Sequence, residues 1–276
     1  MTNTPGRFCG VAACAMFAVF SMAGCGPGAH RGDGSPPSPA PPGWPAALSD
    51  FTMVWTADPG IDVTTGPAVP VRAYTESYLL ASVMGDSKYL YPGFQQSVDP
   101  NQSIDHPTGT QFLWPKTDNP AKTPWVGTDH AHISSVTTSG PDVTVVVCEY
   151  TFGSAQRARN GYAPNIGQPP PYSGIDPMRI TLTAPAEPRP QLPAQRGPAR
   201  TPSVDAFNAW RITSHQGGYF ARSGVGDEWP NAVEDRNTCL AKAPQHPDLQ
   251  RGGEYPRADF PTQPPSPGWP APSGAS

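Results

Sequence analysis

Charged residues are scarce in this 276-residue chain: they make up 14% of it, with only four lysines against 14 arginines. A formal net charge of −4 and the lack of any basic cluster argue against a nucleic-acid-binding protein. The chain also lacks the GxSxG, Walker A, HExxH and CxxC motifs, so nucleophilic hydrolysis and phosphate-loop chemistry have no sequence support. These absences favour a protein that is not an enzyme, and they give no reason to expect a cofactor.

The sequence also has no apolar run long enough to cross a membrane. Its longest uncharged apolar stretch, 8–23, has 16 residues, whereas a spanning helix needs roughly 20. The stretch follows Arg7 and ends in small residues at Ala23 and Gly24, which is the layout of a secretory signal peptide. We therefore expect residues 1–24 to be removed.

The signal ends in Met22-Ala23-Gly24-Cys25, which resembles the bacterial lipobox, with Met in place of the commoner Leu. The resemblance implies that the thiol of Cys25 takes a lipid and becomes the new N-terminus. Acyl chains would then hold the protein at the outer face of the cell membrane, and an unmodified Cys25 would leave it secreted. With its excess of Ala, Gly, Pro and Arg, the chain resembles actinobacterial, mycobacterial-type envelope lipoproteins.

Few cysteines remain once the signal is removed. Cys9 and Cys14 leave with it and Cys25 is acylated, so Cys148 and Cys239 are the two thiols left in an oxidising compartment. We expect them to form a disulfide.

The 39 prolines gather in three tracts. We interpret 25–46 as a tether that starts at the lipidated cysteine, 184–203 as an insertion, and 244–276 as a disordered tail. A single domain would then occupy 47–243. The pentapeptide PGWPA occurs at 42–46 and again at 267–271, and its tryptophans either dock on a surface or repeat by chance.

Hydrophobic periodicity changes from helical to strand-like along the domain. The spacing predicts a helix over 67–84, with Pro70 in its first turn and Gly85 at its end, and a shorter helix over 87–97. Alternation then predicts a long antiparallel hairpin, 125–137 with 143–152, and two further strands near 178–183 and 210–213.

This order, helices first and then about four strands ending in the "WRI" of 210–212, resembles the NTF2-like or cystatin-like cone. The resemblance implies an α+β fold in which a curved antiparallel sheet wraps the helices; an all-β sandwich is the alternative. In SnoaL-type members of this class, acid-base side chains line a pocket between helix and sheet.

The candidate site residues fall into two groups. Tyr74, Tyr78 and Glu149 would line the pocket of a cone, either as acid-base groups or as core packing. His130 and His132 project from one face of a strand and could bind zinc or copper, although no third or fourth ligand is placed by spacing. The leading hypothesis is a lipid-anchored envelope protein that binds a small apolar ligand or a partner protein; a SnoaL-like enzyme and a metal-binding protein are the alternatives.

Overall fold

The computed structural model describes residues 44–103, 105–187, 189–220 and 229–272. All of them belong to one compact unit, 37–276. The predicted signal peptide, Cys25 and most of the predicted tether lie outside the described residues. Among the residues that are described, no helix is long and apolar enough to span a membrane.

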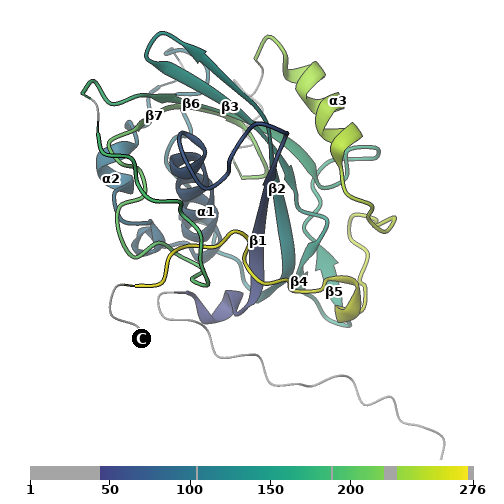
Figure 1. Cartoon of the computed structure of the whole chain (residues 1–276). Helices are drawn as coiled ribbons and strands as arrows, with labels where there is room; N and C mark the ends of the chain where they lie inside the picture. The colour runs from purple at the N-terminus through teal and green to yellow at the C-terminus, as the bar shows by residue number, and fades with distance from the viewer. Residues whose placement is uncertain (1–43, 104, 188, 221–228, 273–276) are drawn as a thin grey trace, which may run out of the picture. The chain divides into compact units, whose positions relative to one another are not determined.

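A seven-stranded sheet forms the body of the protein (Figure 1). Its strands run in the order β5-β4-β2-β3-β6-β7, and β1 pairs with β2. The β1–β2 pair is parallel and the other pairs are antiparallel. The strands are β1 (Asp50–Ala57), β2 (Trp125–Ser139), β3 (Asp142–Tyr150), β4 (Ser154–Arg157), β5 (Tyr162–Pro164), β6 (Ile175–Thr183) and β7 (Arg211–Gly217).

Helix α1 (Ala68–Met84) lies against one face of this sheet and is enclosed on all sides. Every residue from Ala68 to Val83 is buried, because the sheet covers one side of the helix and loops cover the other. The helix ends where predicted: Gly85 takes the left-handed conformation with φ +63° and donates to the carbonyl of Ala81. A side chain at Gly85 would also meet Pro120, 2.7 Å from the added Cβ.

The alternation predicted for the strands is confirmed. Val143, Val145 and Val147 of β3 point to the α1 side and join its core cluster. Cys148 and Tyr150 point to the other face, where a smaller cluster packs under the C-terminal part of the chain. In β6, the apolar residues that alternate toward α1 are Met178, Ile180 and Leu182.

That second face is covered by α3 (Ala232–Lys242), as Figure 1 shows. The sulfur atoms of Cys148 in β3 and Cys239 in α3 lie 1.99 Å apart, which is the pairing expected from the cysteine count. The hydroxyl of Tyr150 donates to the carbonyl of Cys239 at 2.9 Å. The covalent bond and the hydrogen bond together hold α3 on the sheet.

The α+β class is confirmed, but the predicted element order and strand number are wrong. Strand β1 precedes α1, so the helices do not come first, and the sheet has seven strands rather than about four. The predicted helix over 87–97 is instead a 3-10 turn, η2 (Ser87–Tyr89), and one helical turn, α2 (Phe94–Ser97). Pro92 separates them because it cannot donate a helical hydrogen bond.

The prediction of a disordered tail over 244–276 is wrong for the described residues 244–272. Trp269 is only 1% exposed, and its indole N–H donates to Oε2 of Glu76 in α1 at 2.6 Å. Trp44, from the other PGWPA copy, is also buried and donates to the carbonyl of Leu48. Both repeated tryptophans therefore dock on the protein itself, and the folded part extends beyond the predicted 47–243.

The Pro-rich insertion also packs on the domain where it is described. The N–H of Gln195 donates to the carbonyl of Thr64 at 2.8 Å, and Ala199 pairs with Trp269 in an isolated bridge. The guanidinium of Arg72, fully buried in α1, donates to the carbonyls of Val63, Gln195 and Gly268. One buried cation thus joins the insertion and the C-terminal segment to the central helix.

Candidate functional site

Two of the cavities that adjoin α1 differ sharply in volume. The smaller one, the inner chamber, lies between α1 and the sheet, and Tyr78, Glu149 and His215 contribute to its lining. The structure thus brings two of the three predicted pocket residues, Tyr78 and Glu149, to one chamber. Tyr74, the third, lies one helical turn before Tyr78, with ring centroids 5.7 Å apart.

His215 of β7 is the group in this chamber that sequence reasoning missed. Its Nδ1 lies 2.8 Å from the hydroxyl of Tyr74, and its ring meets Tyr78 edge-on with centroids 5.0 Å apart. Burial lowers the pKa of His215 to about 4 and raises the pKa of Tyr74 well above 10. Both rings are therefore neutral at physiological pH. The 141 residues between them explain why no local motif revealed the pair.

Acidic side chains extend along the sheet beside the chamber. Asp129 of β2 and Asp176 of β6 are buried, and Glu149 of β3 is nearly so. Burial raises the pKa of Asp129 well above its usual range, and the nearby carboxyls of Glu149 and Asp176 raise it further. Oε2 of Glu149 accepts from the N–H of Tyr219 at 2.8 Å. That approach depends on Gly218, whose φ is +79° and whose added Cβ would lie 2.9 Å from the same oxygen.

Aromatic side chains line the inner chamber and leave little space in it. Tyr219 lies in the lining, and the ring of Phe220 stacks on Trp125 with centroids 5.9 Å apart. Tyr219 and Phe220 meet edge-on at 4.9 Å. The space left is only about 10 Å³, at the lower limit of what one water molecule needs. No substrate fits in the chamber in this form.

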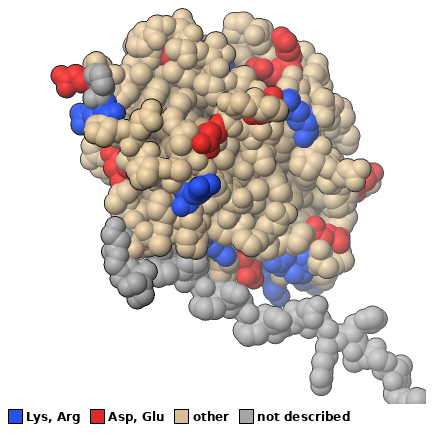
Figure 2. Space-filling model, viewed as in Figure 1, with Lys and Arg blue, Asp and Glu red and all other residues tan. Residues whose placement is uncertain are grey.

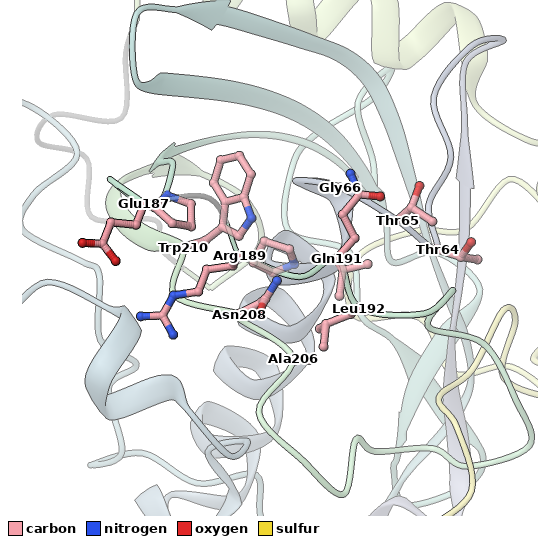
Figure 3. Close-up of a pocket in the computed structure, with 13 residues that line it drawn as sticks. Thr64, Thr65, Gly66, Glu187, Arg189, Gln191, Leu192, Ala206, Asn208 and Trp210 are labelled. Atoms are coloured by element: carbon pink, nitrogen blue, oxygen red, sulfur yellow. The ribbon is translucent and has the colours of Figure 1, made fainter.

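The larger cavity, the rim cavity, lies at the N-terminal end of α1 and has a volume of about 220 Å³ (Figure 3). One wall is the loop that enters α1, and the other is the insertion after β6 together with the residues before β7. In Figure 3 the indole of Trp210 and the side chain of Gln191 stand on opposite sides of the cavity, with Asn208 between them. The side chains of Glu187 and Arg189 extend outward beside Trp210.

Sequence reasoning did not single out the rim cavity. Its lining comes from three separate segments: Thr64, Thr65, Gly66, Val69 and Pro70; Pro185, Glu187, Arg189, Gln191 and Leu192; and Ala206, Asn208 and Trp210. Most of these residues lie in turns or in a tract interpreted as an insertion. The signal available in the sequence was Trp210, which lies next to a polar segment at the start of the predicted strand near 210–213.

His130 and His132 share a face of β2, as their spacing predicts, and both ring nitrogens of His132 lie near other polar side chains. Nε2 of His132 lies 3.0 Å from Oδ1 of Asp58, and its Nδ1 lies 2.8 Å from the hydroxyl of Thr56. Asp58 also accepts from Nζ of Lys242 in α3. Burial lowers the pKa of His130. Within the described ranges, no group of three or more His, Cys, Asp or Glu residues is arranged to hold a metal ion.

One face of the protein shows how its charges are distributed. On the face shown in Figure 2, blue and red side chains are scattered among uncharged ones and do not gather in a patch of one sign. Comparison with known proteins does not assign the site either, because no family model, no curated protein and no solved structure matches this chain.

Proposed function

We propose that this protein is a non-enzymatic, lipid-anchored component of the cell envelope that binds a small ligand in its rim cavity. The observation that carries the proposal is the contrast between the two cavities. The chamber that holds the acid-base side chains is almost filled, with Tyr219 and Phe220 in its lining, whereas the rim cavity has a volume of about 220 Å³ and Glu187 as its one carboxylate. A binding role therefore suits the geometry better than catalysis.

The lining of the rim cavity changes the kind of ligand expected. Val69, Pro70 and Leu192 supply apolar surface, but Asn208 and Gln191 place amide groups beside it. The proposed ligand is therefore partly polar and not purely apolar. A partner protein that presents such a group remains compatible with this proposal.

The proposed membrane anchor rests on the Met22–Cys25 lipobox resemblance and on where the folded part begins. Trp44 is the first buried residue described, so 18 residues, 26–43, separate it from Cys25. An extended polyproline-like chain rises about 3.1 Å per residue, which gives a reach of up to roughly 56 Å. The anchor would leave the rim cavity free to meet ligands away from the lipid surface.

The proposed fold relationship is an NTF2-like cone. A mainly antiparallel sheet on one side of an enclosed α1 supports it, and the strand before α1 departs from the expected order. A SnoaL-like acid-base enzyme is the second candidate, because Tyr78, His215 and Glu149 line one chamber and the hydroxyl of Tyr74 lies 2.8 Å from Nδ1 of His215. Catalysis there would require Tyr219 and Phe220 to move away from the chamber.

Titration of His215 by NMR separates the two candidates. The chain has six histidines, so a His215→Gln variant assigns the signal of this ring. In a chamber that stays closed, His215 remains neutral down to a pH of about 4. A ring that titrates near pH 6.5 and exchanges its proton with solvent would show that the chamber opens, and would favour the enzyme over the binding protein.

A further inference from the structure

We propose that the rim cavity binds a neutral sugar ring, either a free monosaccharide or the terminal unit of a glycan. This inference rests on the proposed binding function and names the ligand class of the same site. It follows from the chemistry of Trp210, Asn208 and Gln191, from the balance of charge at the mouth, and from the backbone that carries these side chains.

Trp210 supplies a flat apolar wall. Its side chain is partly buried and packs against the core cluster, while its indole also lines the cavity. The indole N–H points toward Asn208 in Figure 3. A pyranose ring has an apolar face of C–H groups and an edge of hydroxyls, so it can place the face on an indole and the edge on polar groups.

Two amides face the space beside this wall. The amide of Gln191 makes no hydrogen bond to any described residue, and Asn208 uses one N–H to reach the carbonyl of Pro190 at 3.2 Å. Each amide offers donors and an acceptor, and each sugar hydroxyl is both a donor and an acceptor. The amides of Gln191 and Asn208 can therefore bind sugar hydroxyls either as hydrogen-bond donors or as acceptors.

The charges at the mouth favour a neutral ligand. Glu187 and Arg189 have opposite charges and extend from the same edge, so their formal charges cancel. The start of α1 is also a poor anion site, because Pro70 has no N–H and the N–H of Val69 is bonded to the carbonyl of Gly66 at 3.3 Å. The start of α1 therefore adds few N–H donors for a phosphate group, and the charge of Arg189 is offset by that of Glu187.

The backbone before β7 is held in an unusual form that places the ligand-facing side chains. Asn208 and Ala209 have φ values of +49° and +65°, a conformation that side-chain-bearing residues seldom adopt. The fully buried Phe207 anchors the turn, and its N–H donates to Oδ1 of Asp205 at 2.7 Å. Asn208 and Trp210 therefore reach the cavity on a preorganised turn, as binding sites require.

The size of the cavity suits one sugar unit. The cavity has a volume of about 220 Å³. One six-membered ring with its hydroxyls occupies a space of this order. A longer glycan would leave its remaining units in solvent.

The test is a binding titration of the full chain with methyl glycosides of glucose, galactose, mannose and N-acetylglucosamine. We expect saturable binding of at least one, observed by saturation-transfer NMR and quantified by calorimetry. Trp210→Leu should weaken it at least tenfold, and Gln191→Ala and Asn208→Gly about threefold to tenfold each. Glycine is chosen at 208 because it accepts the positive φ.

Controls separate binding from folding. Gln245→Ala removes an exposed amide far from the lining in sequence and should leave affinity unchanged. Trp210→Phe keeps a flat ring and should retain part of the binding, and circular dichroism of each variant reports its fold. Glucose 6-phosphate should bind no more tightly than methyl glucoside.

Several outcomes would overturn the inference. They are the absence of saturable binding to all four glycosides, binding that Trp210→Leu and Gln191→Ala leave unchanged in folded protein, and much tighter binding of the phosphorylated sugar. A different result would contradict the proposed function alone. If the sugar binds and the protein also cleaves a labelled oligosaccharide, the sugar site is supported but the non-enzymatic role is refuted.

Discussion

Replacing Trp269 by alanine should detach the C-terminal segment and destabilise the whole domain. The indole is 1% exposed, the guanidinium of Arg72 lies 4.3 Å from its ring centroid, and its N–H donates to Glu76 at 2.6 Å. Large-to-small substitution of a buried tryptophan costs about 3–5 kcal/mol. Since a domain of this kind is stable by only about 5–15 kcal/mol, we expect a loss of about 4 kcal/mol, roughly a quarter or more of the total.

Part of this loss comes from the hydrogen bond and part from packing. Glu76 also accepts from Trp55 and Tyr91, and burial raises its pKa although Arg72 and these hydrogen bonds lower it. Trp269→Phe keeps an aromatic ring in the site but removes the indole donor and part of the ring volume. A hydrogen bond to a charged acceptor contributes about 1.5–3 kcal/mol, so the phenylalanine variant should lose about 2 kcal/mol.

Urea unfolding measures both losses, and hydrogen exchange locates them. The N–H of Ala199 donates to the carbonyl of Trp269, so its exchange should accelerate in the alanine variant before that of the β3 amides. A loss below 1 kcal/mol for Trp269→Ala, or unchanged exchange at Ala199, would refute the view that this segment is part of the folded domain.

Three further predictions follow from buried groups and from the β2 histidines. Reducing the Cys148–Cys239 bond, or replacing both residues by serine, should cost up to about 4 kcal/mol, since the bond closes a 91-residue separation; equal urea midpoints with and without reductant would contradict this. Because the folded pKa of His215 is about 4 and the unfolded value is near 6.5, the unfolded chain binds protons first as pH falls. Stability should therefore drop by about 3 kcal/mol between pH 6.5 and 4, and His215→Gln should remove this component when the two unfolding curves are subtracted; identical pH profiles would exclude it. Zinc or copper titration should show no micromolar site that depends on His130 and His132; uptake abolished by replacing both would instead establish the metal-binding alternative.

Helix α1, the β2–β3 hairpin and the alternation in β6 could be predicted because their signals are local. Gly85 ends the helix through its own backbone conformation, and each inward valine of β3 is two residues from the next. Strand β1 was not predicted, although Phe51, Met53 and Trp55 alternate along it and join the α1 core cluster.

The packing of the Pro-rich tracts could not be predicted from composition. Their attachment depends on backbone carbonyls, such as those of Gln195 and Gly268, which accept from the buried Arg72. Every residue has a carbonyl, so the side-chain sequence does not reveal which one will be bound. The Tyr74–His215 contact at the candidate site could not be predicted either. These two residues become neighbours only once β7 lies beside the central helix.

Intact mass spectrometry of the protein from the membrane fraction of an actinobacterial host tests the proposed lipid-anchored role most directly. The lipobox resemblance at Met22–Cys25 predicts a chain of residues 25–276 that carries acyl groups and lacks two hydrogens for the Cys148–Cys239 bond. Cys25→Ser should move the protein out of that fraction. An unmodified wild-type chain in the medium, or one that retains residues 1–24, would contradict the proposed anchor.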